Sequence, residues 1–137
     1  MNNKQDIRWK HRFENFHKAF LLLSEVIEQR DISQLTPLEK EGLVQRFIFT
    51  FELAWKTLKD KMTYDGILIS KISPRYVFKL AYQKRYIDNI ELWLKMIDDR
   101  NIMSHNYDEK NFNNLLKFLF QEYYPILKEF HNNIRHE

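Results

Sequence analysis

The sequence predicts an all-α fold, an up-and-down bundle of four or five helices. Glycine occurs only twice and proline three times in 137 residues, which is too few turn residues for a β-sandwich, a barrel or a doubly wound sheet. Large apolar residues instead recur at spacings of three and four, as on the buried stripe of a helix. The length suits a single domain over residues 1–137, and 44% apolar residues are enough for one core.

Two long helices are predicted at the start of the chain. The first carries six large apolar residues on one stripe: Trp9, Phe13, Phe16, Phe20, Leu23 and Ile27. Thr36, Pro37 and Glu39 then supply an N-cap, a first-turn proline and a capping-box glutamate for the second. That helix carries Leu43, Phe47, Phe51, Ala54 and Leu58. Gly66 is expected to close it.

Start signals also mark a third and a fourth helix. Ser73 and Pro74 open a short third helix. Asp88 and Glu91 form a capping box, so the fourth is expected from about Ile90 to Met103. It should bury Leu92 or Trp93, together with Met96 and Ile97.

The last helix is predicted to start at the N-cap Asp108. Its apolar residues are Phe112, Leu115, Leu119, Tyr123, Ile126 and Phe130. Pro125 lies within this pattern, lacks a backbone N–H and clashes with the preceding turn. A kink or break is therefore expected near Tyr124.

Composition excludes several classes of site. The chain has no cysteine, hence no disulfide and no thiolate metal site, and nothing in it indicates a metal or cofactor. It has neither an apolar leader nor a stretch approaching the roughly 20 apolar residues of a membrane span, so a cytoplasmic protein is expected. A net charge of +3 favours an anionic partner. The 15% aromatic content is compatible with a crowded core or with a self-association face.

The segment RNIMSHNY, residues 100–107, holds the candidate functional residues. In a purely structural interpretation, Arg100 pairs with an acidic neighbour such as Asp98 or Asp99, and His105 lies at a negative helix end. A second Arg and His pair at the same spacing, Arg12 and His17, lies inside the first helix. There a five-residue step turns about 140° and separates the two side chains. Arg100 and His105 lie instead at a helix end, where they can converge.

Such a pair suits phosphodiester cleavage. Imidazole exchanges a proton near neutral pH, and guanidinium binds phosphate through two parallel hydrogen bonds. In RNA the 2′-hydroxyl is an internal nucleophile, so the reaction needs no metal. One histidine does not easily serve as both acid and base, whereas a symmetric homodimer would place two copies at one cleft. Tyr107 would approach the same cleft, where an anionic modification would block it, although a packed tyrosine is the simpler interpretation.

At these residues the sequence resembles the HEPN superfamily, and within it the nucleotidyltransferase substrate-binding protein family. RNIMSHNY matches the family signature of Arg, four residues, His, any residue and Tyr. RFIFTFELAWKTLKD at 46–60, SPR at 73–75, WLKMIDDRN before the motif and YYPILKEF near the C-terminus match as well. The likeness covers about residues 10–130.

The resemblance implies a HEPN-like homodimer whose motif lines a cleft between subunits. It implies a metal-independent RNase toxin of a toxin–antitoxin module, with Arg100 and His105 catalytic and Asn101 orienting the phosphate or the histidine. A cognate minimal nucleotidyltransferase would silence the toxin by adding AMP to Tyr107. The competing interpretation is a non-catalytic subunit that binds nucleotide or substrate for that transferase, and a third is a dimeric scaffold. For Arg75 of the SPR block, a salt bridge is expected.

Overall fold

The fold is a helical bundle, as predicted. The computed structural model describes residues 3–105 and 108–136, without the side chain of His105. No strand occurs in these two ranges. The elements in order are α1 (Asn3–Ile27), η1 (Ile32–Gln34), α2 (Pro37–Tyr64), α3 (Pro74–Gln83), α4 (Ile90–His105), α5 (Glu109–Phe118), η2 (Leu119–Tyr123) and α6 (Tyr124–Arg135).

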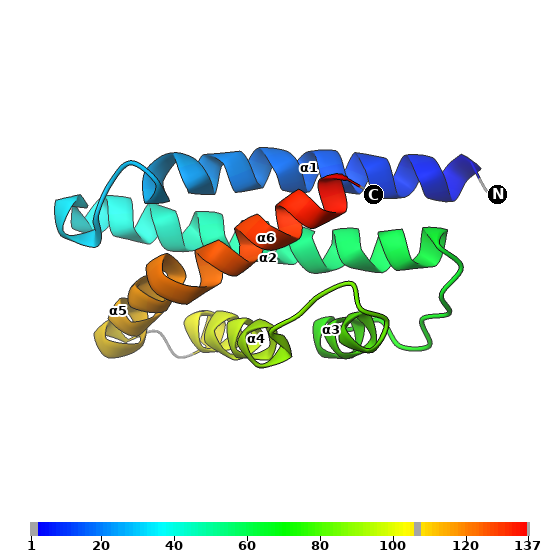
Figure 1. Cartoon of the computed structure of the whole chain (residues 1–137). Helices are drawn as coiled ribbons and strands as arrows, with labels where there is room; N and C mark the ends of the chain where they lie inside the picture. The colour runs from blue at the N-terminus through cyan, green and yellow to red at the C-terminus, as the bar shows by residue number, and fades with distance from the viewer. Residues whose placement is uncertain (1–2, 106–107, 137) are drawn as a thin grey trace.

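The two longest helices, α1 and α2, lie side by side as an antiparallel hairpin (Figure 1). In the same view α3 and α4 lie below α2 and are seen nearly end-on, while α5 and α6 cross the bundle diagonally. α6 packs on α1, and α5 packs on α4. The helix that carries the start of the motif, α4, therefore lies between α3 and α5 and below α2 in this view.

Local capping signals set most helix starts. The Thr36 side chain accepts from the Glu39 backbone N–H, and Asp108 accepts from Asn111 at 2.7 Å, as predicted. The predicted capping box of Asp88 and Glu91 is wrong. α4 begins at Ile90, and the backbone N–H groups of Leu92 and Trp93 donate to the carbonyl of Asn89. Asn89, with φ 54°, therefore holds the N-cap position instead of Asp88, in a left-handed conformation that asparagine tolerates.

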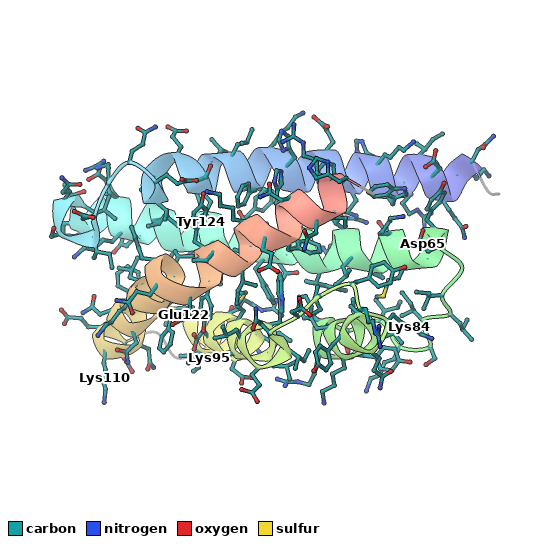
Figure 2. The ribbon with its side chains drawn as sticks, viewed as in Figure 1. Asp65, Lys84, Lys95, Lys110, Glu122 and Tyr124 are labelled. Atoms are coloured by element: carbon teal, nitrogen blue, oxygen red, sulfur yellow. The ribbon has the colours of Figure 1, made fainter. Side chains whose placement is uncertain are left out.

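The interruption predicted near Tyr124 is found as a π-helical segment, η2. Pro125 has no backbone N–H, so the preceding turn lacks a regular i→i−4 donor, and a wider turn accommodates this. Tyr123 and Tyr124, adjacent in the chain, bond to different helical regions: Tyr123 to Asp99 on α4, and Tyr124 to Glu28 just after α1. Figure 2 labels Tyr124 where the last helix crosses the hairpin of α1 and α2.

Most aromatic residues fill the core. The largest fully buried side chains include Trp93, Tyr123, Phe16, Phe47, Phe51 and Phe78. Trp93 is buried and Leu92 only half-buried, which decides between the two residues expected at that turn of α4. Phe49 is the exception among the phenylalanines of α2, since 61% of it is exposed. The aromatic content is thus mainly core, with one phenylalanine ring presented on the surface of α2.

Candidate functional site

Arg100 is held against α2 by an ion pair and by a contact between its guanidinium group and an aromatic ring. Its Nη1 donates to Oε1 of Glu52, forming an ion pair between side chains that are 22% and 26% exposed. Its Cζ lies 5.7 Å from the ring centroid of Phe51, within the range of a cation–π contact. The arginine of the motif is therefore fixed by two consecutive residues of another helix.

Glu52 is itself held in place. Trp55, one turn further along α2, donates its indole N–H to Oε2 of Glu52 at 3.0 Å. The tryptophan is almost fully buried, so this bond ties the carboxylate to the core of the bundle. Glu52 thus uses one oxygen for the tryptophan and the other for the arginine. Such charge-assisted bonds are stronger than bonds between neutral groups.

The acidic residues next to Arg100 have other partners. Asp98 pairs with Arg75 at 2.9 Å, which confirms the salt bridge expected for the SPR arginine. Asp99 accepts a hydrogen bond from the hydroxyl group of Tyr123, and its Oδ2 lies 3.7 Å from Nζ of Lys95. Burial and then the Asp99 hydrogen bond raise the pKa of Tyr123 far above its usual range, which keeps the phenol protonated as the donor. Arg100 is therefore in an ion pair, as the structural interpretation expected. Its partner is Glu52, however, and neither Asp98 nor Asp99.

The other motif residues are described to different extents. Asn101 is exposed on α4 and bonds to no other described side chain. His105 is the last residue of α4, and its side chain lies outside the description. Tyr107, the predicted modification site, lies outside the described residues. The structure thus locates Arg100 and Asn101 on one helix that ends at His105, and the approach of the imidazole to Arg100 stays a prediction.

The second Arg and His pair behaves as the sequence indicates. Arg12 donates to Asp60 at 3.0 Å, whereas His17 shares a 2.8 Å hydrogen bond with His131 of α6. The two side chains therefore have separate structural partners. Spacing alone does not make a site. The expected end of the fourth helix near Met103 is wrong, because α4 continues to His105, so the backbone step from Arg100 to His105 is also helical. What distinguishes this copy is that His105 is the last residue of its helix.

One exposed aromatic ring and two hollows lie near the motif. Phe49 lies three residues before Glu52, on the same side of α2. Ile102, 36% exposed, lies two residues after Arg100 and therefore projects from the other side of α4. Two hollows of about 310 and 210 Å³ flank Met103 of the motif. The first is lined by Glu41, Val44, Gln45, Met103 and Phe112, and the second by Lys95, Asp99, Ile102, Met103, Asn111, Asn114, Leu115 and Phe118. Arg100 lines neither hollow.

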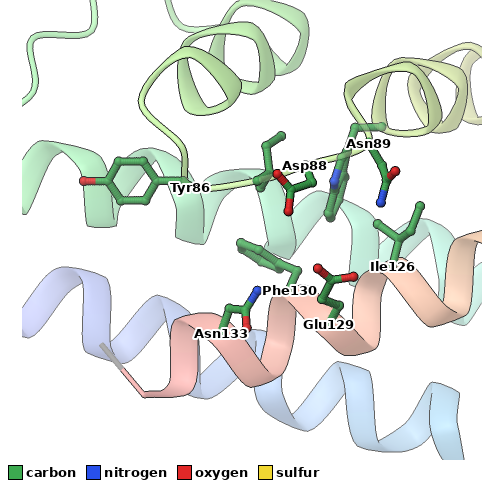
Figure 3. A pocket seen from close by; sticks show the side chains of 9 residues that line it. Tyr86, Asp88, Asn89, Ile126, Glu129, Phe130 and Asn133 are labelled. Carbon is green, nitrogen blue, oxygen red and sulfur yellow. The ribbon is translucent and has the colours of Figure 1, made fainter.

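Other cavities contain none of the motif residues. The pocket in Figure 3, between the connection to α4 and helix α6, is lined on opposite sides by Asp88 and Glu129 but has a volume of only about 10 Å³. That is room for about one water molecule. A cavity of about 560 Å³ lies elsewhere, between the ends of α2 and α6 and the connection after α3. Neither brings together groups suited to the predicted chemistry.

The described residues offer no ready metal site. Among residues 3–104 and 108–136, no three histidine, aspartate or glutamate side chains gather in a metal-binding arrangement. Within the same part of the chain, no helix has both the length and the apolar character to span a bilayer.

Sequence reasoning missed Glu52, the residue that holds Arg100. One signal was available, because Glu52 is the only charged residue between Arg46 and Lys56 in the segment RFIFTFELAWK. A lone acid in an apolar helical run needs a partner, since burying an unpaired charge is costly. The identity of that partner, 48 residues away, is not encoded locally.

An all-helical bundle with a motif arginine clamped near the end of α4 defines a HEPN-like domain. The chain belongs to the nucleotidyltransferase substrate-binding protein family: residues 11–136 match the family model "Nucleotidyltransferase substrate binding protein like". Among curated proteins, it is similar to a "Probable ribonuclease HepT" from Haemophilus influenzae, with 31% identity over 72 residues. That alignment covers 50% of this chain and 49% of the relative, about half the length of each.

A solved structure has the same fold. The chain is similar to a crystal structure of a protein from Thermus thermophilus, with a TM-score of 0.75 and 27% sequence identity. The superposition covers 88% of this chain and 98% of the other.

Proposed function

We propose that this protein is a HEPN-type, metal-independent endoribonuclease toxin whose activity a cognate minimal nucleotidyltransferase controls. The observation that carries the proposal is the Arg100 site: a motif arginine, partly open to solvent, held by Glu52 and Phe51 on the helix that leads to His105. The likeness to a protein called a probable ribonuclease supports the same conclusion, and membership of the family supports a nucleotidyltransferase as the partner.

The proposed reaction uses the RNA's own nucleophile. His105 of one protomer removes the proton of the 2′-hydroxyl, whose oxygen attacks the adjacent phosphorus. The bond to the 5′-oxygen breaks, and His105 of the other protomer protonates that leaving oxygen. The products are a 2′,3′-cyclic phosphate and a free 5′-hydroxyl. Arg100 stabilises the negative charge that develops on the phosphorane oxygens, and Asn101 assists from the next position on α4.

A homodimer supplies the second histidine in this proposal. A two-fold interface presents the same patch twice, so a patch beside the motif brings both motifs to one groove. Phe49 gives that patch a large exposed apolar side chain on α2, one turn before Glu52 of the Glu52–Arg100 pair. Exposed aromatic residues are enriched in such interfaces.

Tyr107 is the proposed regulatory residue. Its phenolic oxygen would lose its proton and attack the α-phosphorus of ATP on the nucleotidyltransferase, and pyrophosphate would leave. The new AMP group would place a negatively charged phosphodiester two residues from His105, where it would repel the RNA phosphate and fill the groove.

The family name favours one alternative. In that interpretation the protein is a non-catalytic subunit that binds nucleotide or substrate for its partner transferase. The same Arg100 would then hold a phosphate without cleavage.

RNA cleavage by the purified protein in EDTA tests the proposal. The wild type is expected to cleave, and His105→Ala to lose about 10²- to 10⁴-fold in rate with unchanged helicity and dimer mass. His11→Ala, which removes an exposed histidine of α1, is the matched control and should keep wild-type activity. Equal cleavage by the two variants would reject His105 as the catalytic group, and a wild type that binds nucleotide without cleaving would favour the alternative.

A further inference from the structure

We propose that Glu52 is the positioning residue of the nuclease site, holding the Arg100 guanidinium in the orientation that a scissile phosphate requires. This inference rests on the proposed function, and it assigns a role to a residue outside the Arg and His motif. Glu52 touches no substrate in this proposal. It acts only through Arg100.

The bonding of Arg100 indicates which part of it faces a ligand. Nη1 donates to Glu52. Nε is buried and has no hydrogen-bond partner among the described residues. Nη2 donates to no described side chain either, and the arginine side chain keeps 22% of its surface exposed. The edge formed by Nη1 and Nη2 therefore retains protons that can bind phosphate oxygens, while the opposite part of the group faces the bundle.

One turn of α2 supplies the whole support. Phe51 lies against the guanidinium face, Glu52 holds one nitrogen, and Trp55 fixes the carboxylate with its 3.0 Å bond. An arginine has many rotamers, and holding one of them in advance removes an entropic cost from binding the transition state. This arrangement is typical of a catalytic group that its surroundings lock in place.

The negative charge of Glu52 also has a cost for RNA binding. A carboxylate beside the guanidinium lowers the positive potential that attracts a polyanion. Removing it should therefore leave KM for RNA unchanged or lower, while kcat falls because Arg100 loses its orientation. A purely structural role would not separate kcat from KM in this direction.

The kinetic test compares three variants at fixed ionic strength. Glu52→Ala is expected to lower kcat about 10-fold or more without raising KM. In Glu52→Gln the amide oxygen still accepts from Arg100, so kcat should recover part of the loss. Arg75→Ala removes another ion pair to α4, with Asp98, and should leave both constants unchanged. A wild-type kcat in Glu52→Ala, or a rise in KM that accounts for the whole loss, would overturn the proposal.

A second measurement is independent of cleavage. The Nε–Hε NMR signal of Arg100, assigned by its disappearance in Arg100→Lys, reports directly on the guanidinium. It should be sharp and slow to exchange with solvent in the wild type and in Arg75→Ala, since Nε is buried. In Glu52→Ala it should broaden or exchange faster.

The two readouts separate the two proposals. An unchanged NMR signal in a folded Glu52→Ala protein would show that Glu52 does not hold the arginine, whatever the activity. The expected NMR change in a protein whose wild type fails to cleave RNA would keep the positioning role of Glu52 and reject the nuclease. If Glu52→Ala fails to fold, Glu52→Met, which fills a similar volume but offers Arg100 no oxygen acceptor, carries the same two measurements.

Discussion

Phe49→Ala provides the sharpest test of the dimer on which the proposed chemistry depends. A fully covered phenylalanine side chain buries about 200 Å². With 61% of Phe49 exposed, about 120 Å² is left for a partner to cover. At about 25 cal/mol per Å², covering this area would contribute about 3 kcal/mol of hydrophobic free energy for each ring. A two-fold interface contains two such rings, which gives about 6 kcal/mol.

Association converts only part of this into affinity, because side-chain ordering and imperfect packing offset it. If Phe49→Ala loses only a third of that roughly 6 kcal/mol, about 2 kcal/mol of binding free energy, the dissociation constant of the dimer already rises about 30-fold. Sedimentation velocity over a range of protein concentrations should show this as a shift of the monomer–dimer transition. RNA cleavage should fall with the dimer fraction and return at high protein concentration.

Leu68→Ala is the matched control. Leu68 is 86% exposed, but it lies in the connection between α2 and α3, away from Arg100. It should change neither the transition nor the activity. If Phe49→Ala dimerises and cleaves like the wild type, the interface assigned to this face is wrong, and the shared-groove mechanism loses its support.

Three further changes have defined outcomes. Tyr107→Phe should prevent AMP addition on co-expression with the cognate nucleotidyltransferase, seen as the missing mass increment, while cleavage by the free protein persists. Arg100→Lys should keep the ion pair with Glu52 but lose the flat two-nitrogen edge, so cleavage should fall about 10²-fold with normal thermal stability. Burial and then His17 lower the pKa of His131 in the folded state. The unfolded chain therefore binds the extra proton first, so the free energy of unfolding, from urea titrations, should decrease as pH falls below about 6.5 and level off below the folded pKa. His131→Phe should flatten that dependence, and an equally steep decrease in this variant would assign it to other groups.

The helices were predictable where their signals are local. Thr36 with Glu39, and Asp108, are capping residues that act within one turn, and the structure has the corresponding bonds. The apolar stripe of α2 is equally local, and all five of its predicted residues are buried: Leu43, Phe47, Phe51, Ala54 and Leu58. The predicted capping box at Asp88 was wrong because α4 begins one residue later than that box requires, directly after Asn89 in the left-handed conformation.

The candidate site was predictable only in part. The motif and its place before the next helix follow from the sequence around residue 100, because capping at Asp108 locates that helix. The end of α4 did not follow, since the helix was expected to stop near Met103 and continues to His105. The partner of Arg100 does not follow. Sequence reasoning offered the two neighbouring acids, but tertiary packing assigned Asp98 to Arg75 and Asp99 to Tyr123. Those pairings are long-range and depend on how α3, α4 and the last helix cross.

The π-helical segment ends at Tyr123, whose hydroxyl helps to fix α4 beside its arginine. In a regular helix, neighbouring residues project about 100° apart. Across the change from η2 to α6, Tyr123 reaches Asp99 while Tyr124 reaches Glu28. The first of these bonds holds α4 one residue before Arg100, and Glu52 holds the arginine itself from α2. The proline that interrupts the last helix thus belongs to the same mechanical support as Glu52, and replacing Pro125 by Ala should disturb the Nε–Hε signal of Arg100 through the Tyr123–Asp99 bond.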